Sequence, residues 1–91
     1  MGLAMVVIII PALMRPYFDG ANRLEVEAST LDAVLRALDD RSPGFYERLV
    51  EDGRVRPELA IAVNGEVYQM ALHERLAPGT QLTIVPAIGG G

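Results

Sequence analysis

The chain has 91 residues, of which 51% are hydrophobic and 22% are charged, and its formal net charge is −4 at pH 7. This length suffices for one domain with a single hydrophobic core but is too short for an enzyme with a separate cofactor domain. The sequence contains no Cys, which excludes disulfides, thiolate nucleophiles, iron–sulfur clusters and Cys-based zinc sites. Its eight basic residues are scattered along an acidic chain, so we expect no nucleic-acid partner.

The apolar run LAMVVIIIPALM near the start is the one candidate for a targeting or membrane segment. Arg15 and Pro16 interrupt it well short of the roughly 20 residues that cross a bilayer, and no positively charged stretch precedes it. The β-branched residues from Met5 to Ile10 instead predict a strand, which Pro11 ends. We therefore expect a cytoplasmic protein with no membrane partner.

A second strand and the main helix are predicted next. RLEVEA, residues 23–28, alternates charged and apolar side chains, as in a strand exposed on one face. In STLDAVLRALDD, residues 29–40, Ser29 and Asp32 have the spacing of a capping box. The helix then carries one apolar stripe, at Leu31, Val34, Leu35 and Leu38. Pro43 prevents it from continuing.

The segment after this helix predicts a short second helix and a turn. FYERLV, residues 45–50, has apolar residues four positions apart, which favours a short helical segment. Residues 51–53, Glu-Asp-Gly, are typical of a polar turn. Asp39 and Asp40 at the end of the main helix oppose its dipole, and the sequence offers no reason for them.

The second half of the chain is rich in predicted strands. ELAIAV, residues 58–63, places Leu, Ile and Val on one face of a strand. Asn64-Gly65 is a strong hairpin signal, because both residues accept the positive φ of a type I′ turn. Residues 66–68 form the expected return strand, and QLTIVP, residues 81–86, predicts the last strand.

The order of these elements, ββαβββ, predicts an α+β fold. We expect a mixed sheet of four to five strands with the first and last strands parallel at its centre. The first strand has an unbroken apolar run, which suits a strand flanked by neighbours rather than an edge strand. Because one main helix covers only one face of such a sheet, the other face should expose apolar side chains, and such patches commonly mark partner sites.

Candidate catalytic and metal-binding residues are sparse. His73 is the single histidine and stands in a predicted loop with no nucleophile near it, so we expect an exposed side chain without a catalytic role. No Gly-rich loop leads from a strand into a helix with a following Lys. The turn at residues 51–53 offers too few oxygen ligands for a metal ion. The sequence predicts no catalytic residue, no metal site and no bound cofactor.

Four segments together resemble the β-grasp sulfur carriers of the ThiS and MoaD family: IPALMRPYFDG, STLDAVLRALDDRSPGFYERLVEDG, ELAIAVNGEV and LAPGTQLTIVPAIGGG. The most specific element is the last, where a strand, one Pro and small or apolar residues precede Gly-Gly. The RP connection, the PGFYERL segment and the VNGE hairpin are most similar to the branch that includes CysO and related MoaD-like proteins. Relatives more often carry Ala or Ser at the position of Gly89, and bulkier residues at those of Ala60 and Ala62.

The resemblance implies a ubiquitin-like β-grasp domain over residues 1–88 and a flexible glycine tail over residues 89–91. In this family an E1-like adenylyltransferase uses ATP and Mg to adenylate the terminal glycine carboxylate, here that of Gly91. A sulfur donor enzyme then enables formation of a thiocarboxylate, which supplies a downstream biosynthetic enzyme. The carrier itself is a protein cosubstrate, not an enzyme.

Physical chemistry gives the glycines separate parts in that scheme. Glycine lets backbone approach closely and takes any φ and ψ, so Gly90 should give clearance beside Gly91, and Gly89 should add reach. Three residues at the base of the tail are expected to dock on partners: Pro86, Ala87 and Ile88. The receiving pathway stays open among cysteine, molybdopterin, thiamine and thiolated tRNA synthesis.

Two alternative functions remain. The chain could be a ubiquitin-like modifier joined through Gly91 to lysines of target proteins. All eight basic residues are Arg, so such a modifier could not form lysine-linked chains of itself. The other alternative is a non-covalent β-grasp binding module, in which the glycines are only a linker or a disordered end.

Overall fold

The protein is described by a computed structural model over residues 5–86, and its main feature is a five-stranded mixed sheet in the order β2-β1-β7-β5-β6. The strands are β1 (Met5–Ile9), β2 (Arg23–Glu27), β5 (Leu59–Val63), β6 (Glu66–Tyr68) and β7 (Gln81–Pro86). β1 and β7 are parallel, and the other pairs are antiparallel. The predicted α+β fold with a parallel pair of first and last strands is confirmed.

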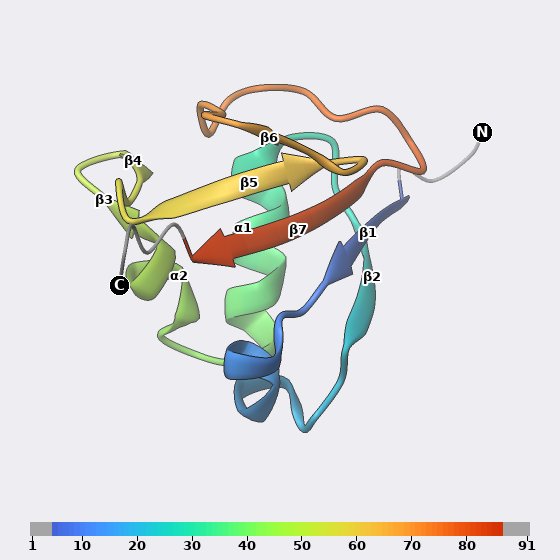
Figure 1. Ribbon diagram of the computed structural model, residues 1–91, viewed down its shortest axis with the longest axis vertical. Helices are drawn as coiled ribbons and strands as arrows, with labels where there is room; N and C mark the ends of the chain where they lie inside the picture. Colours follow the sequence, from blue (N-terminus) through green and yellow to red (C-terminus); the bar gives the residue numbers. More distant parts are fainter. Residues whose placement is uncertain (1–4, 87–91) are drawn as a thin grey trace.

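The main helix, α1 (Leu31–Arg41), covers one face of this sheet (Figure 1). The four side chains of the predicted stripe are all buried: Leu31, Val34, Leu35 and Leu38. They share one core cluster with the inward-facing residues of the strands, among them Val6, Ile8, Leu82 and Ile84. The apolar side chains predicted by the helical and strand periodicities therefore pack together in one core layer between α1 and the sheet.

The start of α1 differs from the prediction. Thr30, not Ser29, is the N-cap residue, and its Oγ1 accepts the N–H of Ala33 at 3.1 Å. The predicted capping box is wrong because the helix begins one residue later. Asp32 then lies too close to the cap to bond back to it, and its carboxylate faces Arg36 and Tyr46 instead.

The second helix, α2 (Phe45–Leu49), is confirmed, and it explains one acidic residue at the end of α1. Asp39 Oδ1 accepts the backbone N–H of Gly44 at 3.0 Å and that of Tyr46 at 2.9 Å. These N–H groups belong to the first turn of α2, which has no earlier helical carbonyl to bond. Asp39 therefore caps the second helix, and this role offsets its unfavourable place in the first.

Two elements were not predicted. A 3₁₀ helix, η1 (Ala12–Phe18), follows β1, and a small hairpin joins β3 (Val50–Glu51) to β4 (Arg54–Val55). The polar turn of residues 51–53 lies inside that hairpin. The hairpin predicted at residues 64–65 is confirmed, with φ of 49° at Asn64 and 92° at Gly65.

The face of the sheet opposite α1 is partly exposed, as predicted. Its apolar side chains alternate with the core residues along the three central strands. We call four of them the open face: Val7, Ile9, Ala60 and Val85. Each is half-buried rather than bare, because neighbouring side chains on the same face shield it.

Replacing Leu38 by Ala tests the contribution of α1 to the core. Leu38 is fully buried, so the substitution removes packed methyl groups and leaves a cavity. We expect the free energy of unfolding to fall by about 2–5 kcal/mol in urea denaturation. Asp40→Ala, an exposed change on the same helix, is the control and should stay within about 0.5 kcal/mol of the wild type. Equal effects of the two variants would contradict this assignment of the core.

Candidate functional site

The residues predicted to react or to dock lie at the end of β7. Pro86 is the last described residue, and it is the register partner of Leu59 at the start of β5. The other candidates lie outside the described residues: Ala87, Ile88, Gly89, Gly90 and Gly91. Their roles stay predictions, whereas the structure fixes the surface from which they extend.

β7 is held on both of its sides. Residues Leu82 to Pro86 are in register with β5, and residues Gln81 to Thr83 are in register with β1. Within β7, Leu82 and Ile84 point into the core and are each 2% exposed. The strand that leads to the tail is therefore fixed in the sheet by β1 in its first half and by β5 up to Pro86.

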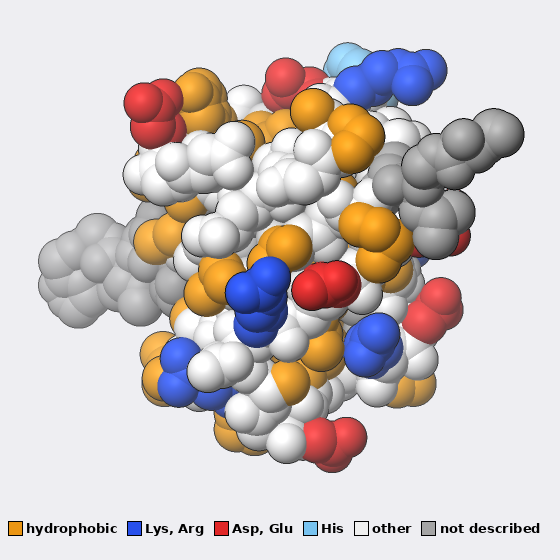
Figure 2. Space-filling model, turned by 90° about the vertical axis from the view of Figure 1, so that its right-hand side faces the viewer, with side chains coloured by type: hydrophobic (Ala, Val, Ile, Leu, Met, Phe, Trp, Pro, Cys, Tyr) orange, Lys and Arg blue, Asp and Glu red, His pale blue; other side chains and the backbone are white. Residues whose placement is uncertain are grey.

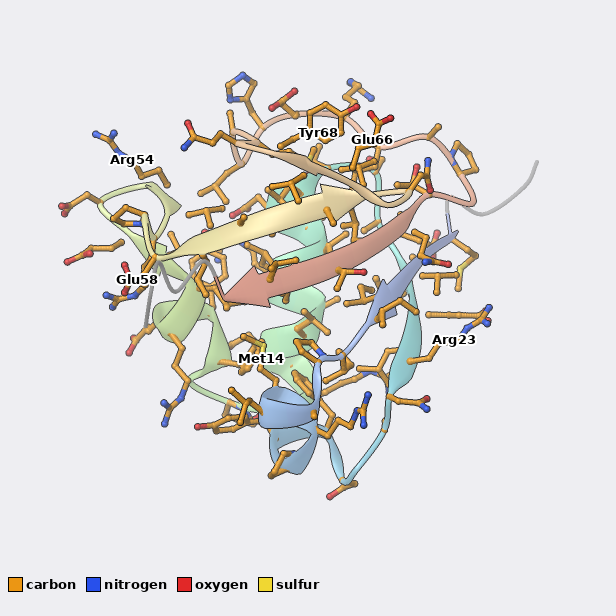
Figure 3. The ribbon with its side chains drawn as sticks, viewed as in Figure 1. Met14, Arg23, Arg54, Glu58, Glu66 and Tyr68 are labelled. Carbon is orange, nitrogen blue, oxygen red and sulfur yellow. The ribbon has the colours of Figure 1, made fainter. Side chains whose placement is uncertain are left out.

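A groove of about 520 Å³ lies near the start of β5, between the β3–β4 hairpin and β6. Leu59 and Ala60 of β5 line it, together with Arg54 from the hairpin and Tyr68 from β6. In Figure 3 the side chain of Arg54 projects from the hairpin, while Tyr68 lies on the opposite wall. Since Leu59 is the register partner of Pro86, this groove lies one strand away from the end of β7.

Arg56 gives the groove a fixed wall. Its Nη2 donates to the backbone oxygen of Glu47 at 3.0 Å, and its Nη1 lies 3.4 Å from Glu51 Oε1 and 3.9 Å from Glu58 Oε2. The guanidinium is thus shared between α2 and the acidic residues around it. Its role is to hold the hairpin against α2, and its charge is largely balanced locally.

η1 lies at the same edge of the sheet as the end of β7, because it directly follows β1 and the two strands are parallel. Leu13 of this helix is 76% exposed and Tyr17 is 39% exposed, while Met14 between them is half-buried against the core. We call Leu13, Met14 and Tyr17 the η1 patch (Figure 3, where Met14 is labelled). The guanidinium of Arg48 lies 4.8 Å over the ring of Tyr17.

A polar cluster joins α1 to α2. Tyr46 Oη donates to Asp32 Oδ1 at 2.5 Å, and Arg36 Nε donates to Asp32 Oδ2 at 2.7 Å. The hydrogen bond from Tyr46, followed by that from Arg36, lowers the pKa of Asp32, and the same bond to Asp32 raises the pKa of Tyr46. These groups satisfy one another, so the cluster ties two helices together and does not resemble a reactive centre. In the sequence only the i,i+4 spacing of Asp32 and Arg36 hints at it.

Acidic and basic side chains are interspersed with hydrophobic ones on the side of the molecule shown in Figure 2. His73 is exposed, as expected.

Across residues 5–86, no group of three or more His, Cys, Asp or Glu side chains is arranged to hold a metal ion. None of the helices in that range has the length and apolar character needed to span a membrane.

Comparison with known proteins agrees with this geometry. The model of the ThiS family matches residues 8–91. The sulfur carrier protein CysO of Mycobacterium tuberculosis is 32% identical over 91 residues, which cover 94% of this chain and 98% of that protein. Small archaeal modifier protein 3 of Haloferax volcanii is 32% identical over 65 residues, covering 69% of this chain and 71% of that protein.

A solved structure extends the similarity to the fold. A chain in the crystal structure of the BexX/CysO complex of Amycolatopsis orientalis superposes with a TM-score of 0.84 at 27% identity, covering 94% of this chain and 99% of that one. The ubiquitin-like β-grasp fold implied by the sequence resemblance is thereby confirmed.

Replacing Tyr46 by Phe tests the polar cluster. The variant loses the hydroxyl that donates to Asp32, so we expect the free energy of unfolding to fall by about 0.5–1.5 kcal/mol at pH 7. Because the folded-state pKa of Asp32 is lowered, this stabilisation is present above the unfolded pKa of about 3.9 and is lost as the pH falls through the folded value. The difference between the two proteins in urea denaturation should therefore shrink below about pH 4.

Tyr17→Phe is the matched control, because Tyr17 contacts its neighbours through its ring. Its stability should follow the wild type across the same pH range. A Tyr46→Phe difference that does not change with pH would show that the hydroxyl acts independently of the Asp32 charge.

Proposed function

This chain belongs to the ThiS family, and from that premise we propose that it is a sulfur carrier protein whose Gly91 carboxylate is adenylated and then converted to a thiocarboxylate. The observation that carries the proposal is a family match that continues through the glycines to Gly91. The fixed position of β7 supports it, because a short tail extending from a rigid strand suits delivery of one group into a partner. In this role the chain is a cosubstrate, and its partners perform the catalysis.

The chemistry requires activation from outside the chain. A terminal carboxyl group has a pKa of about 3.3–3.7, so at neutral pH it is ionised and a poor electrophile. An E1-like adenylyltransferase would join a carboxylate oxygen to the α-phosphorus of ATP and release pyrophosphate, with Mg held by that enzyme. A sulfide-equivalent nucleophile from a sulfur donor enzyme would then attack the carbonyl carbon and displace AMP. The product is a thiocarboxylate on Gly91.

The residues before Gly91 suit entry into a closed active site. Gly90 and Gly89 have no side chains, so backbone at these positions passes through a narrow opening and adapts its φ and ψ to the enzyme. Pro86, Ala87 and Ile88 would contact the rim of that opening. The chain contains no Cys, so no thiol of its own competes for the acyl-adenylate.

The thiocarboxylate would supply sulfur to a downstream biosynthetic enzyme, in synthesis of cysteine, molybdopterin, thiamine or thiolated tRNA. Similarity to CysO over nearly the whole chain favours the first of these for an initial test. The dependence on ATP fits a cytoplasmic reaction. The carrier needs no bound cofactor, since ATP and Mg serve the activating enzyme.

A second candidate function is conjugation to other proteins, which the similarity to small archaeal modifier protein 3 favours. The same acyl-adenylate would then react with the ε-amine of a target lysine to form an amide and release AMP. Cells that express an epitope-tagged form, with the tag before Met1, would contain larger covalent adducts that disappear when Gly90 and Gly91 are deleted. If no adducts form but the thiocarboxylate does, conjugation is refuted and the carrier function stands.

Intact mass spectrometry tests the carrier function directly. The full chain with a free Gly91 carboxyl is incubated with its cognate adenylyltransferase, ATP, Mg and sulfide. We expect the mass to rise by the difference between sulfur and oxygen, and only when ATP is present.

Two control variants check that the reaction occurs at the chain end. Deletion of Gly90 and Gly91, and addition of one Ala after Gly91, should each retain the thermal unfolding midpoint and show no gain in mass. No mass change in the wild type, with an adenylyltransferase that activates another carrier in the same assay, would refute the proposed function.

A further inference from the structure

We propose that the η1 patch is the surface by which the adenylating enzyme recognises this chain. The inference rests on the function proposed above and adds to it a recognition site on the folded domain. It concerns three residues, Leu13, Met14 and Tyr17, with Leu13 as the main contact.

The strand register places η1 beside the end of β7. Ile9 of β1 is in register with Thr83 of β7. Three residues further along each chain stand Ala12, where η1 begins, and Pro86, where β7 ends. Because β1 and β7 are neighbouring parallel strands, η1 and the end of β7 lie at the same edge of the sheet.

The length of the tail then limits where the enzyme can bind. Five residues, 87–91, follow Pro86. Fully extended, they reach at most roughly 18 Å. An enzyme that encloses the Gly91 carboxyl and a nucleotide is much larger than this reach, so its surface must lie against the domain around Pro86. At this edge of the sheet lies Leu13, which at 76% is the most exposed large hydrophobic side chain of the described residues.

Two side chains of the patch, Met14 and Tyr17, are held by contacts within the domain. Tyr17 packs against Phe45 with ring centroids 5.5 Å apart. The guanidinium of Arg48 lies over the Tyr17 ring, 4.8 Å from its centroid. Met14 is half-buried and packs against the core. Little conformational entropy is therefore lost when a partner covers Met14 and Tyr17. The matching surface is an apolar socket for Leu13, with a carboxylate opposite the Arg48 guanidinium.

The first enzyme in the sequence has the greatest need of such a surface. Before activation, the last three residues present only glycines and an ordinary carboxylate, so recognition needs side chains that precede Gly89. A later enzyme meets a thiocarboxylate, whose sulfur already distinguishes this chain from others. Discrimination at the adenylation step therefore needs side chains besides the glycines, and exposed apolar side chains at the same edge of the folded domain add to those at the base of the tail.

Steady-state ATP–pyrophosphate exchange with the cognate adenylyltransferase tests the proposal, using the full chain as the varied substrate. Leu13→Ser should raise KM at least tenfold and leave kcat within twofold, because the contact is made on binding. Leu13→Met keeps an apolar side chain and should behave like the wild type. Val67→Ser is the matched control, since Val67 is 64% exposed but lies on the edge strand β6. Equal thermal midpoints would show that all the variants fold.

The outcomes separate this inference from the function on which it rests. Wild-type activity with equal KM values for Leu13→Ser and Val67→Ser would overturn the inference and leave the carrier function standing. A defect of Leu13→Ser seen only with the sulfur-receiving enzyme would also overturn it, because the patch would then serve a different partner. No exchange with the wild type would refute both.

Discussion

The pairing of β7 with β1 on one side and β5 on the other is the constraint on which the rest of the molecule depends. It brings the first and last strands together, so the core closes only when both ends of the chain are in place. It also sets which surfaces surround Pro86. The parallel pair places η1 on one side of that point, and the antiparallel pair places Leu59 and the groove on the other. Strand topology thus determines which surfaces of the domain flank the end of β7, before the tail in which the chemistry is proposed.

Much of the fold follows from periodicity in the sequence. The stripe from Leu31 to Leu38 and the unbroken apolar run of β1 each indicate an element and the face it buries, and Asn64-Gly65 defines its hairpin. η1 was missed because a 3₁₀ helix that contains Pro16 has no repeating apolar pattern. The N-cap was misplaced because Ser29 and Thr30 are adjacent residues with equivalent chemistry, and the choice between them depends on tertiary contacts, such as the bond from the Leu31 N–H to the Glu74 oxygen.

Part of the candidate site could be predicted from the sequence and part could not. The glycines at the end could be singled out from sequence, because three residues without side chains after a strand are unusual and match a family pattern. Their surroundings could not. The shared edge of η1 and the end of β7 depends on pairing between residues more than 70 positions apart, Ile9 and Thr83, and no local pattern encodes it. Likewise, Asp39 appears unfavourable in α1 until α2 is seen to begin beside it.

The double pairing of β7 also gives the domain a direction of mechanical strength. Hydrogen bonds between strands run across the strand axis, whereas a force applied through the residues after Pro86 acts along it. Such a force loads both ladders in shear, so the bonds resist together instead of opening one after another. An ATP-dependent unfoldase that pulled the chain from this end would first have to extract β7, which is paired on both sides.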